Sequence, residues 1–158
     1  MRRLWRGAVT AKPLDHLTVR VAGRPAPQGS KQMGEHGQMR EQSAYLPAWR
    51  DAVKRAVYEK YRELEVPPDV LPLLRGPVGV VIEFRLQTGQ RIDSAPDLDK
   101  LERATWDALT KARVWEDDGR VVYSHATKRT ADSEHAAGAL ITVVRCPEWT
   151  DLDRLVSC

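Results

Sequence analysis

The sequence predicts an α+β fold, with a single domain in which a small mixed β-sheet packs against two main helices in the chain order β-α-β-α-β-β. Its length of 158 residues suits one domain. Four segments carry strand-like apolar patterns, and two longer ones repeat apolar residues every three or four positions. Loops rich in Gly, Pro and charged residues separate these segments, as expected for helices covering a sheet.

The first half of the chain is expected to supply one strand and one helix. Leu17, Val19 and Val21 alternate with other residues, which indicates a strand. Residues 23–38 are rich in Gly, Pro and polar residues and predict an exposed loop. Residues 44–63 predict a helix with one apolar and one basic face, which a proline-rich linker ends.

The second half is expected to supply three strands and the other helix. Residues 77–87 indicate a strand, and residues 99–112 a helix with an apolar stripe. Two further strands are predicted over residues 121–128 and 139–144. Residues 131–138 should connect them as a hairpin-type turn.

Residues 1–15 are interpreted as a flexible basic arm, residues 16–147 as the domain, and residues 148–158 as a C-terminal tail. The apolar runs are too short for a membrane span, and no secretory signal is recognised. The two cysteines have no partners at metal-ligand spacing, which fits free thiols in a reducing compartment. We therefore expect a cytoplasmic protein without a membrane partner.

Positive charge is concentrated in the first half of the chain. The net charge is +3 and the pI is about 9.0, but residues 20–62 alone carry nine Lys/Arg against four Asp/Glu. This asymmetry favours a nucleic-acid partner, with chance asymmetry on a solvated surface as the alternative. The side chains predicted to hold DNA are Arg24, Lys31, Arg40, Arg50, Lys54, Arg55, Lys100 and Lys111.

Two aspartates, Asp97 and Asp99, stand at the start of the second expected helix. In a helix, residues two apart point about 200° away from one another, whereas in an extended segment they share a face. Pro96 favours extended geometry for Ala95, so the two carboxylates can converge just before the helix. Simple capping of the helix N-terminus is the alternative.

A second acidic pair, Asp117 and Asp118, follows the apolar residues Val114 and Trp115, which should anchor the segment in the core. The helix is about 20 Å long, and an extended segment 113–118 covers about the same length. We therefore expect the chain to run back beside the helix and bring one of the pair near the first two aspartates. A polar turn before a strand is the alternative.

Three carboxylates repel one another and normally converge around a cation. Mg²⁺ prefers such oxygen ligands, and it supplies what phosphodiester cleavage needs, an activated water and a stabilised leaving oxygen. Arg103, one turn after Asp99, is placed to stabilise charge on the phosphate, or else forms an ordinary surface ion pair. The sequence lacks H-E-x-x-H, G-x-S-x-G and P-loop motifs, so no small-molecule cofactor is expected.

Residues 95–122 resemble the RusA family of Holliday junction resolvases. The upstream stretches G-R-P-A-P-Q-G-S-K and P-A-W-R-D-A-V are similar to phage-type members. The motifs that carry the resemblance are Asp97-Leu98-Asp99-Lys100-Leu101, Asp107-Ala108-Leu109-Thr110 and Val114-Trp115-Glu116-Asp117-Asp118.

The resemblance implies a homodimer that cuts four-way DNA junctions symmetrically with Mg²⁺, for which Mn²⁺ is a substitute. It also implies Asp97, Asp99 and Asp118 as catalytic metal ligands, with Asp117 as their neighbour. The sequence departs from the family pattern at two positions, since Lys100 replaces an asparagine and Arg103 a lysine. Arginine keeps the charge but does not donate a proton near neutral pH, so its role is electrostatic, or Lys100 or Lys31 supplies the cation.

Two other functions stay open at this point. A non-catalytic protein that binds branched DNA would keep the fold, but converging aspartates would then only repel phosphate. A metal-dependent enzyme acting on a small phosphate ester would need no basic first half. A nuclease acting on branched DNA accounts for both the aspartates and the basic charge.

Overall fold

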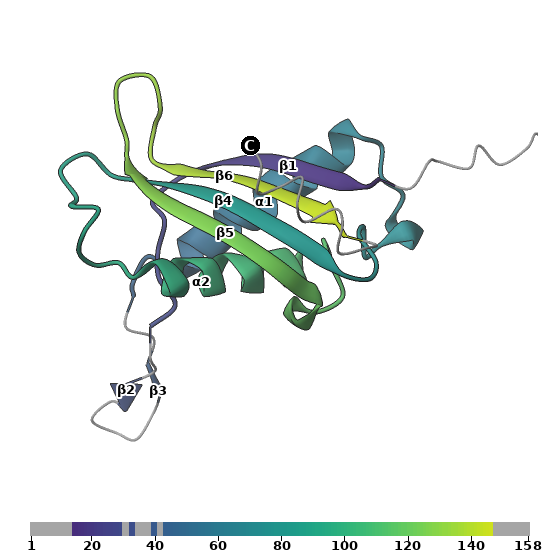
Figure 1. Ribbon diagram of the computed structural model, residues 1–158, viewed down its shortest axis with the longest axis horizontal. Helices are drawn as coiled ribbons and strands as arrows, with labels where there is room; N and C mark the ends of the chain where they lie inside the picture. Colours follow the sequence, from purple (N-terminus) through teal and green to yellow (C-terminus); the bar gives the residue numbers. More distant parts are fainter. Residues whose placement is uncertain (1–13, 30–31, 34–38, 41–42, 147–158) are drawn as a thin grey trace, which may run out of the picture.

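One four-stranded β-sheet organises the chain, with the strand order β1-β6-β4-β5 and two helices packed on one of its faces (Figure 1). The computed structural model describes residues 14–29, 32–33, 39–40 and 43–146. The predicted α+β class with a small mixed sheet is confirmed. The predicted basic arm and C-terminal tail lie almost entirely outside the described residues and stay predictions.

The elements follow the predicted order, with boundaries shifted by a few residues at most. The main ones are β1 (His16–Ala22), α1 (Leu46–Glu63), β4 (Val78–Leu86), α2 (Leu98–Lys111), β5 (Val121–Thr130) and β6 (Gly138–Arg145). Four short elements were not predicted, namely β2 (Gln32–Met33), β3 (Met39–Arg40) and two 3₁₀ turns, η1 (Pro68–Val70) and η2 (Asp118–Arg120). β2 and β3 pair with each other inside the predicted loop region.

The sheet is mixed because α2 crosses from β4 to β5. β4 and β5 run parallel, which requires a crossover, while β6 runs antiparallel to both β4 and β1. The predicted hairpin between the last two strands is therefore wrong, because β5 and β6 flank β4 on opposite sides and do not pair. This arrangement makes β4 a central strand, as its buried Val80, Ile82 and Phe84 require.

The core lies between the helices and one face of the sheet. Alternate residues of β4 point into it, whereas Glu83 and Arg85 lie on the outer face. α1 begins with a proline in its first turn and buries one apolar stripe, including Trp49. Trp49 packs near the Phe84 ring and donates its indole N–H to Thr105 of α2 at 3.2 Å.

A polar contact outside the core also joins the two helices. Arg50 donates to Asp107 of α2 at 2.6 Å and to Gln28 at 3.0 Å, and its side chain is 20% exposed. These bonds fix α1, α2 and the segment after β1 relative to one another. Neither α1 nor α2, nor any other helix in the described part of the chain, is long and apolar enough to cross a membrane.

Candidate active site

The amino end of α2 carries two exposed carboxylates. Asp97 is the N-cap residue, with extended backbone angles (φ −67°, ψ 140°), and Asp99 lies in the first helical turn. Asp97 is extended, but Leu98 and Asp99 are already helical, so the two aspartates do not share one extended segment as predicted. The loop after β4 leads into α2, so both residues lie at the carboxyl end of the parallel strands, the edge at which open α/β sheets bind ligands.

Lys100 is the nearest cation to this pair. Its ammonium lies 2.9 Å from the Asp97 carboxylate. The hydrogen bond from Lys100 lowers the pKa of Asp97, with the charges of Lys100 and Lys128 acting in the same direction. Asp97 in turn raises the pKa of Lys100, to which Asp99 adds a smaller effect. Asp97 is ionised near neutral pH, and the charge of Lys100 attracts both aspartates, Asp97 more strongly than Asp99.

Lys128 holds the loop that precedes Asp97. From the carboxyl half of β5, its ammonium donates to the main-chain carbonyl oxygens of Ser94 and Pro96, both at 2.9 Å. Sequence reasoning missed this role, because Lys128 appears in the sequence only as the end of an alternating strand. Lys128 is a positioning residue for Asp97.

A cleft of about 520 Å³ opens beside Asp97 and Lys100. Its opposite wall comes from the segment after β1 and the start of α1. There the Arg24 guanidinium lies 3.9 Å from the centre of the Tyr45 ring, a cation–π contact. The cleft therefore presents two cations and a carboxylate together, which is the mixture of charges that a metal-bound phosphate group requires.

Asp118 lies at the other end of the molecule. Val121, the first residue of β5, pairs with Val78 at the amino end of β4, whereas Lys128 contacts the loop before Asp97. Lys128 is seven residues beyond Val121, a rise of about 23 Å along the strand, so Asp118 is about 20 Å from Asp97. Figure 1 shows the starts of β5 and α2 at opposite ends of the sheet.

The prediction that residues 113–118 run back along α2 is therefore wrong for a single chain. The main chain at Arg113 and Val114 bonds instead to Leu73 and Leu74, which leads directly into β5. Among the described residues, no group of three Asp, Glu, His or Cys side chains could hold a metal ion. Each chain thus brings Asp97 and Asp99 together at one end of α2 and leaves Asp118 at the other.

The segment that carries Asp118 is itself well anchored. Trp115 is 1% exposed, as predicted, and its indole N–H donates to the Thr110 hydroxyl at 2.7 Å. Asp117 accepts the Gly119 N–H at 2.8 Å and caps η2, which leaves Asp118 exposed at the start of this turn. Of the acidic pair, Asp117 therefore has a structural partner.

Residues 22–143 match the family described as endodeoxyribonuclease RusA. This chain belongs to the RusA family. None of the curated proteins matches it. A solved structure titled "Regulation of the dha operon of Lactococcus lactis" is similar at a TM-score of 0.41 and 15% identity, over 89% of this chain and 39% of that one. A similarity of that size carries no weight for function.

The cations predicted to bind DNA or assist catalysis lie in different surroundings in this RusA-family domain. Arg24 and Lys100 line the cleft beside Asp97. Arg50 is engaged with Asp107 and Gln28, so its described contacts are structural. Arg103, the predicted catalytic helper, is exposed on α2 one turn after Asp99.

The remaining predicted DNA ligands are spread along the helices or belong to the segment between β1 and α1. Lys54 pairs with Asp51 at 2.8 Å on α1, Arg55 is exposed beside it, and Lys111 is exposed in the last turn of α2. Arg40 belongs to β3, of whose side chains nothing is described, and Lys31 lies outside the described residues. Their roles stay predictions.

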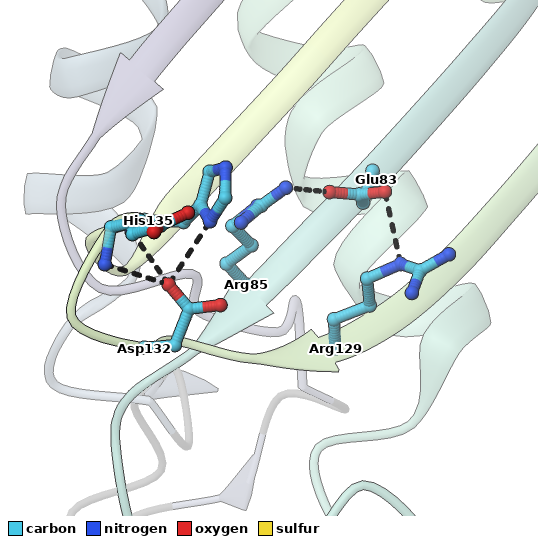
Figure 2. Close-up of polar contacts among 6 residues, drawn as sticks. Glu83, Arg85, Arg129, Asp132 and His135 are labelled. Carbon is cyan, nitrogen blue, oxygen red and sulfur yellow. Dashed lines mark hydrogen bonds and ion pairs between the residues drawn. The ribbon is translucent and has the colours of Figure 1, made fainter.

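A polar cluster on the outer face of the sheet was not predicted (Figure 2). Glu83 of β4 accepts a hydrogen bond from Arg85 and forms an ion pair with Nε of Arg129 on β5 at 3.0 Å. Beyond it, Asp132 accepts from the ring of His135 at 3.0 Å, which lowers the pKa of Asp132. Arg129 remains 65% exposed and adds positive charge at the carboxyl end of β5.

Replacing Lys100 by methionine should raise the pKa of Asp97 toward its ordinary value, because the principal hydrogen bond and charge that lower it are removed. The direction of the Asp97 pKa shift also determines how stability changes with pH. A lowered carboxyl pKa stabilises the fold at pH values above the unfolded pKa, and this contribution disappears as pH falls through the folded pKa. Lys100→Met should therefore weaken the loss of stability on acidification. NMR titration of the Asp97 carboxyl carbon measures the change.

Lys111→Met is the matched control for this prediction, because it removes one lysine from the far end of the same helix. It should leave the pKa of Asp97 where it is. An Asp97 carboxyl whose titration is the same with and without Lys100 would contradict the ion pair.

Proposed function

We propose that this RusA-family chain is a Mg²⁺-dependent endonuclease that resolves Holliday junctions and other branched DNA by paired, symmetric phosphodiester cleavage, in recombination and repair. Its partners are branched DNA and a second copy of the chain, and it acts in the cytoplasm. The observation that carries the proposal is the pair of exposed carboxylates, Asp97 and Asp99, beside a cation-lined cleft in a domain of an endodeoxyribonuclease family.

The residues at the amino end of α2 fit a divalent metal by their chemistry. Asp97 and Asp99 offer hard carboxylate oxygens, both are exposed, and Asp97 is held ionised. They would hold Mg²⁺, or Mn²⁺ in its place; Asp118, at the other end of the same chain, can join them only from the second copy of the chain. Bound there, the metal supplies an activated water and stabilises the leaving oxygen.

The neighbouring cations position and stabilise the phosphate. With Asp97 engaged by a metal, the ammonium of Lys100 would be available to a phosphate oxygen. Arg24 across the cleft and Arg103 on α2 add fixed positive charge where negative charge develops. Because arginine does not donate a proton near neutral pH, Arg103 acts electrostatically.

A non-catalytic protein that binds branched DNA is the alternative. Against it, Asp97 lines the same cleft as Arg24 and Lys100, the cations that would contact phosphate, and Asp99 is exposed two residues further along α2. Without a metal they would weaken DNA binding. In a metal-dependent nuclease they would hold the metal.

One comparison separates the two functions. The protein is incubated with a synthetic four-way junction and with linear duplex of the same sequence, each with and without Mg²⁺, next to Asp97→Asn. Paired nicks on the junction that require both Mg²⁺ and Asp97 support the nuclease. Binding without cleavage by the unmutated protein would establish the alternative. Because the contacts are mainly to phosphate, binding should weaken steeply as salt is raised.

A further inference from the structure

Tyr45 is an exposed aromatic side chain at the start of α1. It directly precedes the helix, and its side chain makes no capping hydrogen bond to it. Tyr45 is 51% exposed, whereas the next residue, Leu46, is 1% exposed and anchors the main chain in the core. The fold therefore fixes where the ring lies, while the surface of the ring stays accessible to a ligand.

Arg24 covers one face of this ring. Its guanidinium, on the segment after β1, lies 3.9 Å from the ring centre. A planar guanidinium stacked on an aromatic ring leaves the opposite face as the one that a second planar group can reach. Both residues line the cleft that also contains Asp97 and Lys100. An aromatic stacking surface and a candidate metal ligand therefore share one cleft.

The two walls of this cleft are joined by hydrogen bonds. The main-chain N–H of Gln28 donates to the carbonyl oxygen of Lys100 on α2 at 3.0 Å. The side chain of Gln28 accepts from Arg50 of α1, which also bonds to Asp107 of α2. The ring at the start of α1 and the carboxylate at the start of α2 are thus held in place before a ligand binds, and such preorganisation favours affinity.

The lining of the cleft suits one nucleotide. Its volume of about 520 Å³ falls within the range of about 300–1,000 Å³ that is typical of small-ligand sites. The charges of Asp97 and Lys100 suit a phosphate group with its metal. Much of the remaining wall consists of small or apolar residues, namely Pro25, Ala26, Pro27, Ala44, Ala95 and Pro96. A phosphate bound beside Asp97 would therefore have the planar base of its own nucleotide next to an apolar wall and an aromatic ring.

We propose that Tyr45, with Arg24 on its other face, stacks on an unpaired DNA base of the nucleotide whose phosphate lies at Asp97. The placement of the phosphate rests on the proposed nuclease function. Inside a continuous duplex both faces of a base are covered by its neighbours, so a base reaches an aromatic side chain only where it leaves the stack. Bases at a branch point do so at a lower cost, because their stacking is already interrupted. Tyr45 therefore favours branched over linear DNA.

Binding measurements without Mg²⁺ test this stacking independently of cleavage. The unmutated protein and Tyr45→Ala are titrated with a four-way junction, a duplex with one unpaired base and a continuous duplex. Tyr45→Ala should bind the first two about 5- to 150-fold more weakly, as expected for the loss of one aromatic stacking partner. Its affinity for the continuous duplex should stay unchanged, since phosphate contacts dominate there.

Tyr45→Phe and Tyr58→Ala are the matched controls. Phenylalanine keeps the ring and removes only the hydroxyl, so Tyr45→Phe should bind all three DNAs as the unmutated protein does. Tyr58 is 47% exposed on α1, close to the exposure of Tyr45, but it is not among the described residues that line the cleft. Tyr58→Ala should therefore keep the preference for branched DNA. Circular dichroism checks that each variant is folded.

Photochemical cross-linking locates the base. A 5-iododeoxyuridine at the branch point of the junction, irradiated in the complex, should couple to Tyr45, and mass spectrometry of the digested protein identifies the residue. Three results would overturn the stacking even if the protein cuts junctions with Mg²⁺. They are an unchanged affinity of Tyr45→Ala for the junction, equal affinity of the unmutated protein for junction and duplex, and a cross-link that maps to another residue.

A failure of the proposed function gives a different result. A cross-link at Tyr45 and weaker junction binding by Tyr45→Ala, in a protein that does not cleave with Mg²⁺, would overturn the nuclease and leave the base-stacking site standing.

Discussion

An Asp99→Asn variant should cleave a four-way junction on the order of 100-fold more slowly than the unmutated protein, or worse, while still binding it. Asparagine keeps the size of the side chain but removes the negative charge that holds a divalent ion. Asp99 is exposed in the first turn of α2, and within the described part of the chain its carboxylate forms no hydrogen bond or ion pair that the substitution would break. Single-turnover cleavage and gel-shift binding, measured on the same preparation, separate the two effects.

Asp93→Asn is the matched control for this prediction. Asp93 is also an exposed aspartate in the segment between β4 and α2, and it pairs with Arg91 at 2.7 Å. It should cut at the rate of the unmutated protein. Equal losses in the two variants would mean that general charge near the loop matters and that Asp99 is no metal ligand.

Trp115→Ala should lower the free energy of unfolding by about 3–5 kcal/mol, the usual cost of removing a large buried aromatic side chain. Trp115 is 1% exposed and its indole bonds to Thr110 at the end of α2. The loss includes the cavity left behind and an unpaired hydroxyl. Urea denaturation followed by circular dichroism measures it.

Trp115→Phe isolates the packing of the ring from the hydrogen bond. It keeps most of the apolar volume and removes only the indole N–H, so the expected loss is about 1–2 kcal/mol. If Trp115→Ala unfolded at the same urea concentration as the unmutated protein, the anchoring of the segment before η2 by this side chain would be wrong.

The parts of the fold that follow from local patterns were predictable from the sequence. The apolar residues repeat every three or four positions in α1 and α2 and every second position in β1 and β4. These spacings are local, and each predicted an element of the right type. The pairing of β6 was not predictable in this way. Whether a strand pairs with its predecessor or inserts beside β4 depends on which edge of a central strand is still open, and that is a property of the whole sheet.

The candidate site was predictable to a smaller extent. Pro96 restricts the residue before it, Ala95, so the extended backbone found at Asp97 and the helical one at Asp99 did not follow from it. The approach of Asp118 rested on a length argument that any path of the right reach would satisfy, and the chain takes another path, beside Leu73 and Leu74. Lys128 carried no local signal at all, since its partners are main-chain carbonyls more than thirty residues away.

The lysines around Asp97 affect how a divalent metal ion would bind to this residue. The carboxyl is ionised near neutral pH even at its ordinary pKa, and Lys100, with the charge of Lys128, lowers that pKa further. On the proposed function, a divalent ion binding to Asp97 would therefore displace an ammonium group and no proton. Its binding through Asp97 should then change little with pH near neutrality.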